Sequence, residues 1–435
     1  MGRILLIALR NVFTHTRRSL LLGGAIAFVT FLLVALFAFS SGLQANMLES
    51  ATTLVSGHVN VGGFYKVSPA VARPIVIDYA KVEAVVRATS PHIRAISRRA
   101  RGGFDRVTSP TTSLMNAIAG VDIASDGQLR ERLEILHGDI DALREPGTAL
   151  MFARQAKDLE VGVGDVVSIT GLTSRGIRNR ADVRVAAIAK DMGGLSQILT
   201  FIPEATLNTL YELRPENTGV LMVFLDDRDL ANAVAKDIRT ALRAAGYDLM
   251  EPEAKPFWQK QQNVEREDWT GQQLDVSTWR DEMGQLADIV DALDGFAIAF
   301  TFILMLVIII GIWNTLFMAV RERTPEIGAL RAIGMSRMRV RFMFLAEAGT
   351  LALLAAVSGA LLAGLLVAAL NSAGIAVDNP QLQFVLMSDT LFLHIDPARV
   401  AIAVLVIVLF TALAALWPAH RASKVQPGAA MSHAG

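Results

Sequence analysis

The sequence predicts a polytopic α-helical membrane protein, with four transmembrane helices and a large α+β extracytoplasmic domain inserted between the first and second helices. Three observations support this fold class. Apolar residues gather in four blocks, and a bilayer-spanning helix needs about 20 such residues in a row. The stretch between the first two blocks has the composition of a soluble domain. The arginines that flank the blocks lie mostly at those block ends that would face the same side of the membrane.

Composition excludes several classes of function. The 41 basic and 41 acidic residues balance, so there is no global electrostatic case for binding nucleic acid. The chain has no cysteine, which excludes disulfides, a thiol nucleophile and cysteine-ligated metals. Its seven histidines lack metal-ligand spacing, and no P-loop motif for nucleotide binding occurs. The stretch from Gly194 to Ile198 lacks the last glycine of a serine hydrolase elbow. We therefore predict no catalytic, cofactor-binding or metal-binding residue.

The N-terminal region predicts a cytoplasmic start. Residues 1–18 contain four arginines and no acidic residue, and we expect a cytoplasmic amphipathic helix there. The first span covers residues 19–41. A cleaved signal peptide has a similar outline, but this apolar run is longer and three more blocks follow, which favours an uncleaved anchor. No lysine or arginine occurs between Ser19 and Lys66, so the next domain is expected outside.

A paired helical stalk is predicted between the spans and the outer domain. It comprises residues 42–55 after the first span and 279–295 before the second. Apolar residues there recur at three- and four-residue intervals, the rhythm of a coiled coil. The predicted seam consists of Leu43, Met47, Leu54, Trp279, Met283, Leu286, Val290 and Leu293.

The outer domain, residues 56–278, mixes strand and helix patterns and is expected to form two α+β lobes. Segments rich in β-branched residues predict strands at 58–61, 164–171, 182–189 and 219–227. Amphipathic periodicity predicts helices at 78–89 and 229–246, and the last strand and helix resemble half of a split β-α-β unit. Residues 259–279 are polar and weakly patterned, and we expect them to form the descent to the stalk. The arginine clusters at 98–106 and 175–184 suit either an anionic partner or solvated loops.

The rest of the chain returns three times through the membrane. An arginine-rich loop follows the second span, and the next loop contains aspartates but no lysine or arginine. Ala355, Gly359 and Ala363 are small residues at four-residue spacing, which predicts close helix packing. The predicted segments are a second span (296–320), a cytoplasmic coupling loop (321–341), a third span (342–370), a short outside loop (371–398), a fourth span (399–417) and a cytoplasmic tail (418–435).

A short helix is predicted inside the arginine-rich loop. Between Glu326 and Gly334, the spacing of Ile327, Leu330 and Ile333 places these side chains on one face. A short amphipathic helix held between two spans would present a docking surface on the cytoplasmic side.

These residues carry a family resemblance. The runs TWRDEMGQLADIVDALDGF and RERTPEIGALRAIGMSRMRVRFMFLAEA, with the span between them, resemble the permease domain of MacB/FtsX-type ABC transporters. The tail LWPAHRASKVQPGAAM is similar to the closing pattern of that family. Near the start, ALRNVFTHTRRSLLLGGAIAF and SGLQANMLESATTLVSGHVNV look most like lipoprotein-releasing permeases of the LolC/LolE kind.

The resemblance implies a mechanotransmission permease in a bacterial inner membrane, with both termini cytoplasmic and a periplasmic domain. Its implied partners are a cytoplasmic ABC ATPase dimer, a second permease copy or a related permease, a periplasmic adaptor or carrier, and membrane lipids. ATP and Mg would bind to the ATPase and no cofactor to this chain. The implied ATPase-coupling residues are Arg321, Glu322, Arg323, Glu326, Ile327, Gly328, Leu330, Arg331 and Gly334.

Three functions stay open at this point. The first is extraction or transport of lipoproteins or other amphiphiles, driven by the partner ATPase. The second is MacB-like efflux of drugs or peptides. The third is FtsX-like regulation, in which the outer domain activates a periplasmic cell-wall hydrolase without moving a substrate.

Overall fold

The computed structural model describes residues 16–68, 71–173, 176–322, 324–377, 379–386 and 388–424. Two compact units divide the chain. The helical unit comprises Met1–Gln44, Val290–Ile375 and Phe392–Gly435, and the α/β unit comprises Ala45–Ile289 and Ala376–Leu391. The predicted amphipathic helix over residues 1–18 lies outside the described residues except for its last three positions, and the predicted coupling residue Arg323 lies outside them too.

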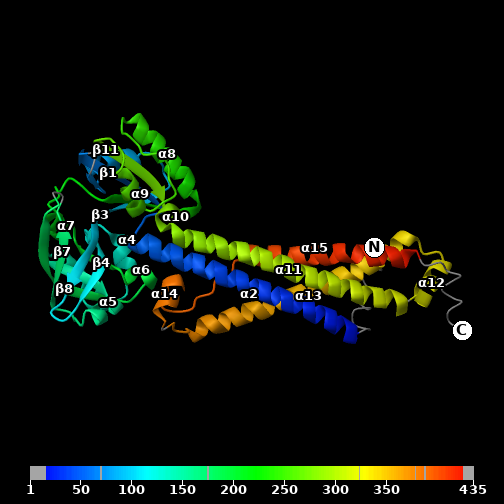
Figure 1. Ribbon diagram of the computed structural model, residues 1–435. Coiled ribbons are helices and arrows are strands. Elements are labelled where there is room, and N and C mark those ends of the chain that lie inside the picture. Colours follow the sequence, from blue (N-terminus) through cyan, green and yellow to red (C-terminus); the bar gives the residue numbers. More distant parts are fainter. Residues whose placement is uncertain are drawn as a thin grey trace. The chain divides into compact units, whose positions relative to one another are not determined.

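Four long helices and one short helix build the helical unit, and they are labelled in Figure 1. The four long helices are long and apolar enough to cross a membrane, and the predicted spans fall within them. Two of them, α2 and α11, contain residues of both units. The helices are α2 (Thr16–Leu54), α11 (Gln285–Glu322), α12 (Thr324–Ala332), α13 (Arg337–Ala373) and α15 (Pro397–Ser423).

Side chains from all four long helices share one apolar core, which includes Ile26 of α2, Ile312 of α11, Ala352 of α13 and Ile407 of α15. Alanine dominates the α13 and α15 contribution, which lets these helices approach closely. The outward faces carry exposed leucine, isoleucine and phenylalanine throughout α11, α13 and α15. Such surfaces are unfavourable in water and are compatible with lipid tails.

Eleven strands form one mixed sheet in the α/β unit, in the order β11-β1-β10-β3-β4-β9-β6-β8-β5, with β2 beside β1 and β7 beside β3 and β8. Only β4–β9 and β6–β8 pair in parallel among these described strands. The strands are β1 (Val59–Ser68), β2 (Val71–Arg73), β3 (Ile93–Thr108), β4 (Ser113–Val121), β5 (Ile135–Gly138), β6 (Thr148–Phe152), β7 (Val166–Leu172), β8 (Arg178–Ala189), β9 (Leu199–Pro203), β10 (Val220–Leu225) and β11 (Gly271–Thr278).

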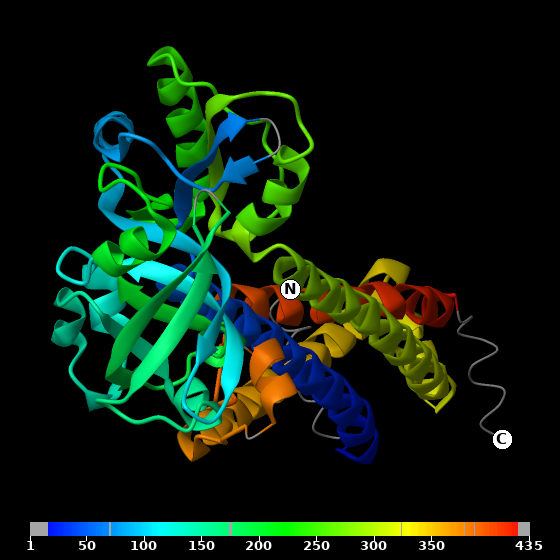
Figure 2. The same cartoon turned by 60° about the vertical axis from the view of Figure 1, so that its left-hand side comes forward.

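The first lobe has a ferredoxin-like β-α-β-β-α-β arrangement. It contains β1, β3, β10 and β11, with α3 and α8 covering one face of the strands. Apolar residues of both helices pack on β1, β10 and β11, and Figure 2 shows the green helix α8 beside these strands. The predicted split unit is confirmed, because β1 lies between β10 and β11. The helices of this lobe are α3 (Tyr79–Arg87), η2 (Arg228–Leu230), α8 (Ala231–Ala244), α9 (Phe257–Val264) and α10 (Trp279–Met283).

The second lobe is inserted between β3 and β10. Its sheet is buried on both faces, as β6 illustrates: Ala149 and Met151 enter one core, while Leu150 and Phe152 enter the other. The helices of this lobe are α4 (Gly127–Arg132), η1 (Ile140–Arg144), α5 (Ala153–Asp158), α6 (Gly193–Ser196) and α7 (Glu204–Tyr211). The two expected lobes are therefore joined by one continuous sheet.

Strand β3 belongs to both lobes. Its first half pairs with β10 up to Arg99, and its second half pairs with β4 from Arg99 to Thr108. The register shifts between Arg101 and Phe104, at the point where the strand passes from one lobe to the other. A shift of this kind bends a strand and increases its twist.

The weakly patterned segment 259–279, expected to lead to the stalk, contains regular elements that the sequence did not reveal. Helix α9 covers its start, and β11 pairs with β1 over eight residues, from Gly271 to Thr278. The strand pattern was hidden because Asp275 and Ser277 are buried polar residues, and their partners lie far away in the sequence or on another element. Polar residues at buried positions remove the hydrophobic alternation that identifies a strand.

The second half of the predicted stalk is not one continuous helix. Helix α10 ends at Met283, and α11 starts at Gln285 after Gly284, whose φ of 47° favours glycine. The first half is continuous, since α2 reaches Leu54 without a break. Of the predicted seam, Leu43, Met47, Leu54 and Met283 are buried, Trp279 and Leu293 are half-buried, and the side chains of Leu286 and Val290 lie outside the described set.

The predicted outside loop at 371–398 contains a short helix, α14 (Pro380–Leu386). Within the α/β unit, Phe384 of α14 packs directly over Gly194 of α6, and Gln197 donates to Gln383 at 3.1 Å. This loop is therefore part of the α/β unit rather than a plain connection.

Candidate functional site

Helix α12 is fastened to the ends of α13 and α15. Ile327 is buried against Val340 and Phe344 of α13 and Ala422 of α15. A backbone carbonyl near the end of α15, on Ser423, accepts a hydrogen bond from the Arg331 guanidinium at 3.3 Å. The short helix is thus held by both apolar and polar contacts.

The opposite side of this region is exposed and apolar. Ile333 is 85% exposed and Met338 is 69% exposed. Arg321, Arg337 and Arg339, which flank α12 in the sequence, are also exposed. Large apolar side chains at such exposure mark an interaction surface. We call these five residues, which lie just before and after α12 in the chain, the α12 surface.

Two features of the predicted loop helix were wrong. Ile327, Leu330 and Ile333 do not share a face, because Ile327 is buried, Leu330 is half-buried and Ile333 is exposed. The helix ends at Ala332. The Ile333 amide still donates to the Ala329 carbonyl at 3.1 Å, and the chain turns directly after it at Gly334, which has a φ of 101°. Of the other predicted coupling residues, Arg331 is half-buried, Gly328 is buried, and Arg321, Glu322, Glu326 and Gly334 are exposed.

The helices α2 and α13 meet backbone to backbone at Gly359. A Cβ atom on Gly359 would lie 2.2 Å from the carbonyl oxygen of Ala27. Ala355 and Ala363, one turn before and after, are buried as well. Only glycine leaves room for this contact.

Polar groups join α2, α11 and α15 elsewhere in the helical unit. The Asp294 carboxylate accepts hydrogen bonds from Ser40 and, at 2.8 Å, from Gln44. The Arg399 guanidinium lies 3.6 Å from the same carboxylate. Trp313 of α11 also donates to the carbonyl of Ala414 in α15 at 2.9 Å, so it joins these two helices.

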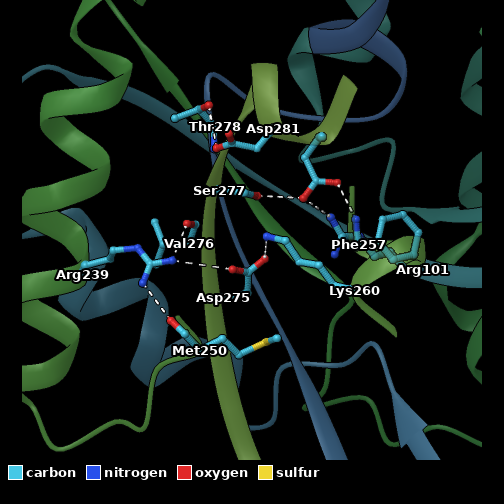
Figure 3. Close-up of polar contacts among 11 residues, drawn as sticks. Arg101, Arg239, Met250, Phe257, Lys260, Asp275, Val276, Ser277, Thr278 and Asp281 are labelled. Carbon is cyan, nitrogen blue, oxygen red and sulfur yellow. Dashed lines mark hydrogen bonds and ion pairs between the residues drawn. The ribbon is translucent and has the colours of Figure 1, made fainter. Parts of the chain in front are cut away.

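In the α/β unit, a buried ionic network surrounds β11, as Figure 3 shows. The Asp275 carboxylate contacts Lys260 at 2.7 Å and Arg239 at 3.7 Å. Arg239 also donates to the carbonyls of Met250 and Val276. Burial raises the pKa of Asp275, although the charges of Lys260 and Arg239 act in the opposite direction.

The network continues to α10, which precedes α11. Glu282 accepts hydrogen bonds from the Ser277 hydroxyl at 2.7 Å and from the Phe257 amide at 3.3 Å. The Arg101 guanidinium of β3 lies 3.5 Å from Glu282 and 3.9 Å from the centre of the Phe257 ring. Burial lowers the pKa of Arg101, and Glu282 opposes that shift. The start of α10 has a capping box, in which Asp281 accepts from both the amide and the hydroxyl of Thr278.

The arginine cluster at 98–106 is only in part a solvated surface. Arg99 is buried and contacts Asp126 at 2.9 Å, and the side chain of Arg101 is only 9% exposed beside Glu282. Arg98, directly before Arg99, points to the other face and lies over the Tyr79 ring. The two interpretations offered for this cluster, an anionic partner and a solvated loop, both require exposed arginines. Both were wrong for Arg99 and Arg101.

Comparison with known families identifies both parts of the chain. A model described as the MacB-like periplasmic core domain matches residues 19–241, more than half of the 435 residues. A model described as the FtsX-like permease C-terminal matches residues 298–427. The chain belongs to the MacB/FtsX-type ABC transporter permeases.

Relatives of this permease are similar over limited parts. A 50-residue segment is 52% identical to the ABC transporter permease YtrF of Bacillus subtilis (strain 168), and it spans 12% of each chain. The extracellular domain of the noncanonic ABC-type transporter YknZ from Gram-positive bacteria is 14% identical, covering 43% of this chain and 95% of that one (TM-score 0.30). The periplasmic region of MacB from Actinobacillus actinomycetemcomitans is 12% identical, covering 54% and 94% (TM-score 0.31).

The four long helices and the periplasmic-type domain of this permease fit a multi-pass inner-membrane protein. Sequence reasoning missed the buried charges Arg99, Arg101, Lys260, Asp275 and Glu282. One signal was available: arginines two residues apart in a strand share a face, which is unusual for a solvated loop. Their acidic partners could not be found, because they lie on other elements.

A half-buried acid in the second lobe makes a pH dependence testable. Tyr211 donates a hydrogen bond to Asp105, and burial raises the pKa of Asp105 despite that bond. A folded-state pKa above the unfolded value gives stability that is complete below the ordinary aspartate pKa of about 3.9 and is lost as pH rises through the folded value. Asp105→Asn should therefore flatten the fall in thermal stability between about pH 4 and neutrality. Equal slopes in parent and variant, measured by thermal unfolding of the full chain in detergent, would contradict this assignment.

Proposed function

We infer that this permease works with a separate cytoplasmic ABC ATPase, which binds the α12 surface. The observation that carries this proposal is the exposure of two large apolar side chains, Ile333 and Met338, in a segment that also exposes Arg337 and Arg339. The exposed arginines suit an aqueous partner with acidic groups better than lipid tails, and the exposed apolar side chains suit a hot spot. ATP and Mg would be bound by the ATPase dimer, while this chain contributes the docking surface.

In this proposal, closure of the ATPase pair displaces α12, and the displacement passes through the bundle. Ile327 and Arg331 join α12 to α13 and α15, so a push on the α12 surface reaches the long helices. Helices α2 and α11 each contain residues of both units and are the candidates for carrying it to the α/β unit. A second copy or a related permease would complete the assembly, with both termini in the cytoplasm and the α/β unit in the periplasm.

The proposed substrates are lipoproteins or similar amphiphiles at the outer face of the inner membrane. The resemblance of the N-terminal segments to lipoprotein-releasing permeases supports this choice. A periplasmic machine that pushes on an amphiphile needs no polar pathway through the bundle. A periplasmic carrier, rather than an efflux adaptor or a cell-wall hydrolase, would then be the outer partner.

A co-purification experiment tests the proposal. The permease is solubilised from its own membranes in mild detergent, and every co-purifying chain is identified by mass spectrometry. We expect a P-loop ATPase together with a lipoprotein carrier or a second permease. An adaptor with an outer-membrane duct would favour efflux, and a hydrolase would favour regulation. The Ile333→Asp variant should recover less ATPase than the parent, and recovery of no ATPase from the parent would contradict the transport function.

A further inference from the structure

The last turn of α2 is held by a buried arginine of strand β3. The Arg99 guanidinium donates to the carbonyl of Leu54, the last residue of α2, at 2.7 Å. It also donates to Asp126 at 2.9 Å, and Asp126 in turn caps the start of α4. The last carbonyls of a helix have no partner within the helix and carry its negative end, so a cation is well placed there.

The end of α10 is held by the next residue on the same face of β3. Arg101 lies against Glu282, and Glu282 is itself hydrogen-bonded to Ser277 and Phe257. The close approach of the Arg101 backbone to Gly219 depends on that glycine, because a Cβ there would lie 2.3 Å from the Arg101 amide nitrogen. Only Gly284 separates α10 from α11.

We propose that Arg99 and Arg101 are positioning residues that join both long helices to one strand, so that movements of α2 and α11 converge on β3 and are passed to both lobes. This inference rests on the proposed function. Strand β3 can pass movement to both lobes, because it pairs with β10 of the first lobe up to Arg99 and with β4 of the second from Arg99 onward.

Ionic contacts transmit a helix movement to β3 better than apolar contacts would. Apolar side chains can slide past one another with little change in energy, whereas a buried ion pair holds one geometry and is unfavourable when its partner moves away. The side chains of Arg99, Asp126, Arg101 and Glu282 are nearly inaccessible to water, so no solvent can replace a lost contact. A helix displacement must therefore move β3.

The test measures the response of the lobes to ATP in the full permease with its ATPase in nanodiscs. The chain contains no cysteine, so spin labels can be placed at two introduced cysteines without background. Lys157→Cys in the second lobe and Lys236→Cys in the first are exposed sites. Electron–electron distances are compared between the nucleotide-free and the ATP-bound, trapped states.

The parent is expected to change its interlobe distance with ATP. Arg99→Met and Arg101→Met should each lose most of that change while ATP hydrolysis continues, and the charge swap Arg101→Glu with Glu282→Arg should restore part of it. Arg98→Met is the matched control, since Arg98 lies on the same strand but faces away from the α2 and α10 contacts. It should respond like the parent.

The possible results distinguish a failure of this inference from a failure of the proposed function. A parent-sized change in both methionine variants would overturn the role of Arg99 and Arg101 and leave the ATP-driven permease intact. No change in the parent would overturn both proposals. If the methionine variants fail to assemble, Arg99→Lys retains the charge but cannot hold Asp126 and Leu54 together. A full response in that variant would also overturn the inference.

Discussion

Ile333→Asp is expected to weaken binding of the permease to its ATPase by at least about 30-fold, since a hot-spot side chain contributes about 2 kcal/mol or more. The substitution places an uncompensated charge on the α12 surface, where a partner would exclude water. The fold should be unaffected, because Ile333 is 85% exposed and lies after the end of α12. Titration of the purified ATPase against permease in detergent measures the affinity.

Ile375→Asp is the matched control. This isoleucine is also exposed and belongs to the same unit, but it follows α13 at the end remote from α12 along the chain. Its affinity for the ATPase should equal that of the parent. Leu330→Asp and charge reversal at Arg331 are less suitable tests, because Leu330 is half-buried and Arg331 donates to Ser423. Parent-like binding by Ile333→Asp would show that the ATPase contacts another surface.

Gly359→Leu is expected to destabilise the helical unit by about 3 kcal/mol, the upper end of the usual cost of overpacking. The new Cβ would lie 2.2 Å from the Ala27 carbonyl oxygen, so the backbones of α2 and α13 must separate. Separation opens gaps around Ile26 and Ala352, which lie in the same core. A thermal unfolding curve in detergent should shift downward by roughly 6–12 °C for a unit of this size.

Gly349 on the same helix provides the comparison. A Cβ at Gly349 meets nothing within 4 Å, so Gly349→Leu should leave the unfolding temperature unchanged or raise it. Leucine is favoured over glycine inside a helix by somewhat less than about 1 kcal/mol. If Gly359→Leu and Gly349→Leu unfold at the same temperature, the contact between α2 and α13 does not limit the stability of the unit.

The local spacing of apolar residues was enough to predict those helices and strands in which that spacing is unbroken. The strands β7, β8 and β10 and the helices α3 and α8 follow apolar residues spaced by two or by three and four, and each was predicted within a few residues of its bounds. Of β1, which ends at Ser68, only the first residues were predicted. Long uncharged runs likewise predicted the regions of α2, α11, α13 and α15. Elements with buried polar residues were not predicted. Strand β11 is the example, because Asp275 and Ser277 contact residues outside the strand.

The candidate sites were likewise predictable from the sequence only in part. The sequence located the α12 loop through its arginines and its short helical repeat. It could not assign the exposed face, because a turn at Gly334 after Ala332 decides that Ile333 points outward while Ile327 is buried. The same holds for Arg99 and Arg101, whose partners Asp126 and Glu282 lie 27 and 181 positions further along the chain.

The sequence by itself determined the fold class, the family and the approximate place of each membrane helix, because hydrophobicity and charge act over short stretches of chain. The tertiary structure alone decided which charges are buried, which side of α12 is open and how two lobes share one sheet. Those features depend on pairings between distant segments, and a buried charge is tolerated only where such a pairing supplies its partner. In this chain β3 brings several of them together, through Arg99, Arg101 and its pairing with both lobes.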